Sequence, residues 1–279
     1  PVIIMIHGYK FAPGHATACP HRHILSLQPE AGRRKALSWP RGLGFGSGAR
    51  DEGLGISFGW PARGTIWQAY RAAARAGLAL AELIRATRRI APARPVHLLA
   101  HSLGARVALS ALPHLPEAAV DRAVLLNPAE YGGRARQALS APAGRSAEIF
   151  NITSRENDLF DFLMERLIAP PERGDATLSQ TMPRQPNTLT LQLDHAGALQ
   201  ALGDMGFSIA PPAGRVCHWS AYLRPGVFDL YRALLRRPGS YPQARLRALL
   251  PETPDPRWSR MLPRPGMRLP RPAQRGVPL

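Results

Sequence analysis

The residues best suited to do chemistry surround Ser102, in the segment Val96-His97-Leu98-Leu99-Ala100-His101-Ser102-Leu103-Gly104. An apolar run precedes this serine and a helix-compatible run follows it, which predicts a strand, a tight turn and a helix. A serine held in such a strained turn needs small neighbours, and Ala100 and Gly104 lie two positions before and after it. The first N–H groups of the helix would also stabilise an oxyanion. The spacing therefore predicts a nucleophile, in a variant of the motif that has alanine in place of the more usual glycine at position 100.

A second feature is the turn Ile6-His7-Gly8-Tyr9-Lys10, which directly follows the first apolar run. Acyl transfer needs two donors aimed at the developing oxyanion. A glycine in this turn lets the backbone approach a substrate closely. We expect the backbone N–H groups of Tyr9 and Leu103 to be these donors. His7 is expected to fix the loop by hydrogen bonding rather than to titrate.

The rest of the chain must position these two turns, and its patterning predicts an α/β fold. Short apolar runs alternate with longer helix-compatible stretches, as in a mostly parallel central sheet flanked by helices on both faces. The predicted strands are 2–6, 55–59, 96–100, 122–127, 147–153 and 189–194. The predicted helices are 65–91, 103–112, 158–168 and 227–237.

The length and composition favour one large domain, because 279 residues with 45% hydrophobic content can bury a sizeable core. We assign residues 1–250 to this domain. The glycine-rich stretch 42–55 is predicted to be a loop. Residues 169–188 contain four prolines and are interpreted as an excursion near the site or a surface loop. Proline and arginine dominate residues 251–279, which are predicted to form an extended or disordered tail.

These motifs, taken together, resemble the alpha/beta hydrolase superfamily. The resemblance rests on the His7-Gly8 turn, on Ser57-Phe58-Gly59-Trp60-Pro61-Ala62-Arg63-Gly64 with Tyr70 in the following helix, and on Ala100-His101-Ser102-Leu103-Gly104. More narrowly, the chain is similar to an uncharacterised bacterial branch with a Trp-Pro-Ser-type turn and a His-Ser-Met/Leu-Gly nucleophile elbow, although position 62 is alanine here. The similarity covers about residues 1–235 and is most specific over 55–110. It implies the alpha/beta-hydrolase fold, lacking the first two strands of the full eight-stranded plan.

The same resemblance implies a catalytic triad in the order nucleophile, acid, histidine. Asp158 best matches the acid, because such acids follow this strand by a short loop that often carries an Asn-Asp or Arg-Asp pair. Glu156 and Asp161 are alternatives for the acid, and Asp158 could instead cap the following helix. His218 is the preferred base because it lies on a late loop before the last helix, and His195 is the alternative.

Charge and cysteine content exclude several other classes of protein. The net charge of +17 comes from arginines spread along the chain, without a recognised nucleic-acid module, so no nucleic-acid partner is expected. Two cysteines rule out a disulfide framework and favour a cytoplasmic location. The string Cys19, His21 and His23 has poor spacing for a tetrahedral metal site and is expected to line a wall above the site. No membrane span, metal or other cofactor is expected.

The sequence thus predicts a serine hydrolase that cleaves a carboxylic ester or a related acyl bond of a small molecule through an acyl-enzyme at Ser102. An acyltransferase or a thioesterase would use the same triad. A non-catalytic scaffold that binds a partner or ligand is an alternative of a different class.

Overall fold

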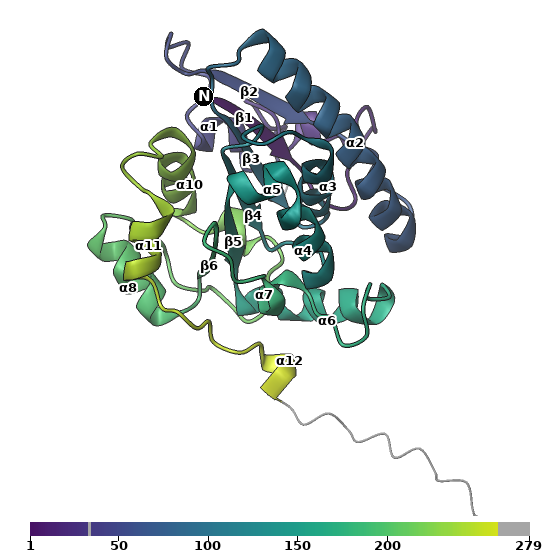
Figure 1. The fold of residues 1–279 in the computed structure, drawn as a ribbon, viewed down its shortest axis with the longest axis vertical. Helices are drawn as coiled ribbons and strands as arrows, with labels where there is room; N and C mark the ends of the chain where they lie inside the picture. The colour runs from purple at the N-terminus through teal and green to yellow at the C-terminus, as the bar shows by residue number, and fades with distance from the viewer. Residues whose placement is uncertain (33–34, 262–279) are drawn as a thin grey trace, which may run out of the picture.

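The computed structural model describes residues 1–32 and 35–261, and it builds them around a six-stranded sheet (Figure 1). The strand order is β2-β1-β3-β4-β5-β6, and each neighbouring pair is parallel. The strands are β1 (Val2–Ile6), β2 (Leu54–Phe58), β3 (Val96–His101), β4 (Arg122–Leu126), β5 (Glu148–Thr153) and β6 (Thr188–Gln192). The predicted α/β class with a parallel central sheet is confirmed.

The helices cover both faces of this sheet. They are α1 (Trp39–Gly42), α2 (Ile66–Ile90), α3 (Leu103–Ala111), α4 (Gly132–Ser140), α5 (Pro142–Ser146), α6 (Asp158–Leu167), α7 (Leu178–Thr181), α8 (Ala196–Asp204), α9 (Ser220–Leu223), α10 (Val227–Arg236), α11 (Gln243–Leu249) and α12 (Trp258–Met261). The long α2 begins with a capping box, in which the Thr65 side chain accepts from the Gln68 N–H and the Gln68 side chain accepts from the Thr65 N–H. The predicted helices correspond to α2, α3, α6 and α10. The other helices, which are α1, α4, α5, α7, α8, α9, α11 and α12, were not predicted, because segments of nine residues or fewer are too short to reveal a helical period.

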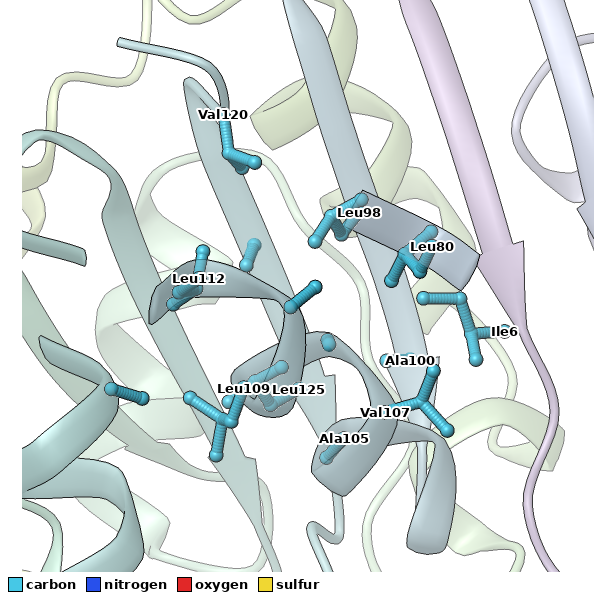
Figure 2. Close-up of a cluster of buried hydrophobic side chains, with 14 of the residues drawn as sticks. Ile6, Leu80, Leu98, Ala100, Ala105, Val107, Leu109, Leu112, Val120 and Leu125 are labelled. Atoms are coloured by element: carbon cyan, nitrogen blue, oxygen red, sulfur yellow. The ribbon is translucent and has the colours of Figure 1, made fainter. Parts of the chain in front are cut away.

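Side chains along each strand alternate between two hydrophobic cores. On β1, Ile4 and Ile6 face the core that α2 and α3 cover, and Ile3 and Met5 face the core that α10 covers. Figure 2 shows the first of these cores, in which Leu80 of α2 lies near strand residues of the sheet. Strands that are buried on both faces explain why the sequence reads as continuous apolar runs rather than as alternating ones.

The parallel strands bring their carboxyl ends to one edge of the sheet. In the register of β1 with β3, Ile6 pairs with Ala100, so the turn after β1 lies beside the turn that carries Ser102. The loops after β4 and β5 follow at the same edge. Loops at this edge of an α/β sheet are where ligand sites form.

The beginning of the Pro/Arg-rich segment packs against the domain. Arg257 is only 3% exposed, and Asp255 forms an ion pair of 3.1 Å with Arg155. The remainder of the expected tail, residues 262–279, lies outside the described residues. None of the helices in the described ranges has the length and apolar character that a membrane crossing requires.

One buried histidine of the sheet is expected to make folding sensitive to acid. His97 on β3 is fully buried, and within the described residues neither ring nitrogen has a hydrogen-bond partner. Burial lowers its pKa from 6.5 to about 4. The unfolded chain therefore binds a proton at this position more readily than the folded chain does. The free energy of unfolding is highest above pH 6.5, where His97 is neutral in both states, and it decreases as the pH falls toward about 4.

We expect wild type to lose ~2 kcal/mol more unfolding free energy than His97→Leu between about pH 7 and about pH 5. Leucine fills a similar volume but does not titrate. Urea unfolding of both proteins at the two pH values measures the difference. An equal loss in the two proteins would contradict the assignment of this acid sensitivity to His97.

Candidate active site

Ser102 lies on a sharp turn between β3 and α3. Its backbone has φ of 55° and ψ of −124°, a conformation that side-chain-bearing residues rarely adopt. The turn is held because the Ser102 N–H donates to the Leu126 carbonyl at 3.0 Å and its carbonyl accepts from the Ala129 N–H at 3.1 Å. The last residue of β4 and the loop after it therefore hold the strained backbone of the candidate nucleophile in place.

The two small residues near Ser102, Gly104 and Ala100, are small for different structural reasons. A Cβ at Gly104 would lie 2.5 Å from the Ile6 carbonyl oxygen and 2.7 Å from that of His7, so helix α3 can approach β1 only with glycine there. Ala100, in contrast, is fully buried in the core shown in Figure 2, where its methyl group packs. The alanine that departs from the usual motif is therefore accommodated.

His218 reaches Ser102 from the loop before α9. Its Nε2 lies 2.9 Å from the Ser102 Oγ, which is hydrogen-bonding distance. Burial is the main cause that lowers the pKa of His218 well below 6.5, and the electrostatic effects of the neighbouring His101 and Lys35 lower it further. The imidazole is thus neutral at neutral pH and its Nε2 can accept the serine proton.

Several contacts hold His218 in this position. Its carbonyl oxygen accepts from the His101 Nε2–H at 3.0 Å and from the Asn127 Nδ2 at 3.1 Å. The Phe160 ring stacks on the imidazole with 4.6 Å between ring centroids. His101 is itself buried, which lowers its pKa to about 4, so it stays a neutral donor. These residues were not predicted as part of the site, although Asn127 is the last residue of the predicted strand 122–127, at the edge where a site was expected.

The partner of the other imidazole nitrogen differs from the expected acid. His218 Nδ1 lies 2.6 Å from the Asn157 Oδ1. Asp158 instead accepts from the backbone N–H and the hydroxyl of Ser259, both at 2.6 Å, and forms an ion pair of 3.0 Å with Arg257. The contact expected of Asp158 is therefore made by its neighbour Asn157, which corrects the geometry anticipated from the sequence.

This correction has a local cause. Residues Arg155–Asn157 form a short 3-10 turn, and α6 begins at Asp158. Successive side chains in such a turn point in directions about 120° apart, so only one of the two neighbours can face the histidine. Asn157 points toward the loop of His218, and Asp158 toward the C-terminal segment.

The alternative acids also lie away from the imidazole nitrogen. Glu156 is 3% exposed and pairs with the guanidinium of Arg224, while its carbonyl accepts from the Cys217 N–H at 2.8 Å. Glu156 thereby anchors the loop that carries His218. Asp161 is 2% exposed, and its carboxylate lies 3.7 Å from the guanidinium of Arg257.

The alternative base, His195, lies at the N-terminus of α8 and does not contact Ser102. Its Nδ1 accepts from the Ala198 N–H at 3.3 Å and so caps α8. Its Nε2 lies 3.9 Å from Asp255 in the C-terminal segment. The structure brings His218, and not His195, to Ser102.

The turn after β1 approaches Ser102 closely. A Cβ at Gly8 would lie 2.8 Å from the Ser102 Cβ, so the backbone passes directly over the serine. Neither the Tyr9 nor the Leu103 N–H has a hydrogen-bond acceptor within the described part of the chain. Both N–H groups lie next to the serine in space or sequence, and both are free to bind an oxyanion.

His7 and Trp60 fix this turn. The Trp60 N–H donates to His7 Nε2 at 3.1 Å, its indole N–H donates to the His7 carbonyl at 2.9 Å, and the two rings stack. Burial lowers the pKa of His7 to about 4, which keeps Nε2 an acceptor. The backbone of Ala62 accepts a hydrogen bond from the Lys10 N–H and donates one to the Phe11 carbonyl. Because these bonds need no side chain, alanine can replace the serine of the Trp-Pro-Ser-type turn at this position.

A pocket of about 660 Å³ opens between this turn and the loop of His218. Aromatic rings of Tyr9, Phe11 and Trp219 line it, together with the cations Lys10 and Arg63, and none of its described lining residues is acidic. His23 of the Cys19, His21 and His23 string also lines it, whereas His21 bonds to the Ser57 carbonyl at 3.1 Å. In the described ranges, no three His, Cys, Asp or Glu side chains gather closely enough to hold a metal ion.

Comparison with known proteins gives one family match. A family model described as "Alpha/beta hydrolase of unknown function (DUF900)" matches residues 1–128. This stretch contains the turn after β1, the Trp60 turn and the turn of Ser102, which are the motifs that carried the resemblance. No curated protein matches the chain.

Proposed function

The chain belongs to the alpha/beta hydrolase superfamily, and from this premise we propose that it is a serine hydrolase of carboxylic esters or related acyl bonds. The observation that carries the proposal is the 2.9 Å contact between His218 Nε2 and Ser102 Oγ on a strained turn. A neutral imidazole at that distance can take the hydroxyl proton as the oxygen attacks.

In the proposed reaction, Ser102 Oγ attacks the acyl carbon and His218 Nε2 receives its proton. The N–H groups of Tyr9 and Leu103 bind the oxyanion of the tetrahedral intermediate. His218 then gives the proton to the leaving group, and an acyl-enzyme forms at Ser102. Water, activated by His218, releases the acid. Asn157 accepts from His218 Nδ1–H and so keeps Nε2 free as an acceptor.

The pocket beside Tyr9 and Trp219 is proposed to hold the organic part of the substrate. Its aromatic walls suit an apolar group, and its volume of about 660 Å³ suits a small molecule. Transfer of the acyl group to an acceptor other than water, or cleavage of a thioester, would use the same residues.

Reaction with a fluorophosphonate probe tests the nucleophile. We expect wild type to become covalently labelled and Ser102→Ala to stay unlabelled, because the probe reacts with a serine that a neighbouring base activates. Intact mass spectrometry of the two proteins gives the result. A non-catalytic scaffold would leave wild type unreacted, and equal labelling of both proteins would place the reactive group elsewhere.

A further inference from the structure

Positively charged side chains from three loops line the pocket beside the candidate active site. Lys10 lies on the turn after β1, Arg63 on the turn that carries Trp60, and Lys35 on the loop before α1. The Arg63 Nη1 donates to the Lys10 carbonyl at 3.3 Å, so the guanidinium reaches the turn after β1. The Lys35 ammonium lies over the ring of Trp219, 2.9 Å from the ring centroid. Segments far apart in the chain thus bring positive charge to one pocket.

This charge is not balanced by carboxylates within the described part of the pocket. None of the described lining residues is acidic, and among residues 1–32 and 35–261 no carboxylate forms an ion pair with Lys10 or Arg63. Two other pockets, of about 510 Å³ and about 420 Å³, include Glu130 and Glu252 respectively. A high net charge therefore does not by itself produce a pocket without an acid. A negatively charged ligand would compensate these cations, because a cleft lined by charges of one sign concentrates their field.

The pocket adjoins the groups that would act on an acyl bond. Tyr9, which lines it, directly follows Gly8, where the backbone passes over Ser102. Trp219, on the other wall, directly follows His218, and their ring centroids are 5.8 Å apart. A molecule that fills the pocket would therefore lie next to the candidate nucleophile and base.

The cations of the pocket lie beside aromatic rings. The Lys10 ammonium is 5.8 Å from the centroid of the Tyr9 ring, and Lys35 covers Trp219. An uncharged ester would use the aromatic walls alone. An ester with an additional negative group would use the walls for its apolar part and the cations for charge-assisted hydrogen bonds, which are stronger than neutral ones.

We propose that the substrate carries a negatively charged group, such as a carboxylate, in addition to the acyl bond that Ser102 would attack, and that Lys10 and Arg63 bind this group. The inference rests on the proposed function and names its substrate class, an anionic ester. Lys10 and Arg63 would touch the charged group and not the reacting atoms. Because such contacts are the same before and during the reaction, their loss should raise KM more than it lowers kcat.

The test compares esters that differ in charge but little in size, hydrolysed by the full chain. One pair puts the charge on the acyl chain: the mono-p-nitrophenyl ester of adipic acid and p-nitrophenyl heptanoate. The other pair puts it on the leaving group: para-acetoxybenzoate and para-acetoxybenzamide. We expect kcat/KM to be about tenfold or more higher for the charged member of at least one pair at low ionic strength. This preference should shrink in about 0.5 M NaCl, because salt screens exposed charges.

Lys10→Met and Arg63→Met each remove one cation and keep an unbranched side chain. Each should lower the ratio of kcat/KM between the charged and the neutral ester about threefold or more, mainly through the KM of the charged one. Arg89→Met is the matched control, because it removes the same charge from an exposed side chain in the last turn of α2, at the opposite end of that helix from the Trp60 turn. It should leave the ratio unchanged.

Equal kcat/KM within both pairs would overturn the inference, as would a preference that both pocket variants retain. A preference that Arg89→Met lowers as much as the pocket variants would overturn it too, since net charge would then be the cause. In each case, fluorophosphonate labelling of Ser102 still supports the proposed function. Labelling without hydrolysis of either charged ester also counts against this inference alone, whereas neither labelling nor hydrolysis of any ester contradicts both. If one pocket variant fails to fold, as circular dichroism would reveal, the other decides the outcome.

Discussion

Replacement of His218 with alanine is expected to lower kcat/KM for a p-nitrophenyl ester about 10⁴-fold or more. The physical reason is that Ser102 Oγ then has no base at 2.9 Å and must attack as a neutral hydroxyl. The background rate that is left comes from the oxyanion donors and from substrate binding. Steady-state hydrolysis of a short-chain ester by the two proteins measures the loss.

His195→Ala is the matched control for this experiment, because it removes the other histidine that follows β5 in the chain. His195 caps α8 and approaches Asp255, so its loss should cost some stability and change kcat/KM by less than about threefold. A large loss in His195→Ala with an active His218→Ala would contradict the assignment of the base.

Much of the fold follows from the sequence because the sheet is buried on both faces. Each predicted strand overlaps the observed one to within two residues. The ends of the central strands β1, β3 and β4 were predictable because every one of their residues is buried and most are apolar. The turn of Ser102 was predictable for the same reason: the strand, the serine, the glycine and the helix are consecutive in the chain. The helices that were missed are short ones, such as Gly132–Ser140, in which alanine and glycine obscure the apolar period.

The third member of the candidate site could not be predicted in this way. Asn157 and Asp158 are adjacent, and the sequence favours the carboxylate because it would stabilise an imidazolium. What directs Asp158 elsewhere is Arg257, which lies in a segment distant in the chain that the composition marks only as rich in proline and arginine. A long-range ion pair of this kind leaves no local pattern.

Asn157→Ala is expected to lower kcat/KM about 10²-fold to about 10³-fold, with a smaller change in KM. Without the amide oxygen at 2.6 Å, His218 Nδ1–H loses its acceptor, and the neutral ring can carry its proton on Nε2 instead. That tautomer cannot accept the proton of Ser102. The variant should still fold, because the Asn157 N–H bond to the Ser154 carbonyl, which closes the turn, belongs to the backbone.

Asp158→Asn provides the comparison that separates the two neighbours. It should lower kcat/KM by less than about tenfold, because its carboxylate serves the C-terminal segment through Ser259 and Arg257. Asn157→Asp keeps an acceptor opposite His218 and should therefore be more active than Asn157→Ala. If Asp158→Asn proves the more damaging of the two single changes, the carboxylate must reach the imidazole during the reaction, and Asn157 is then a neighbour of the triad and not its third member.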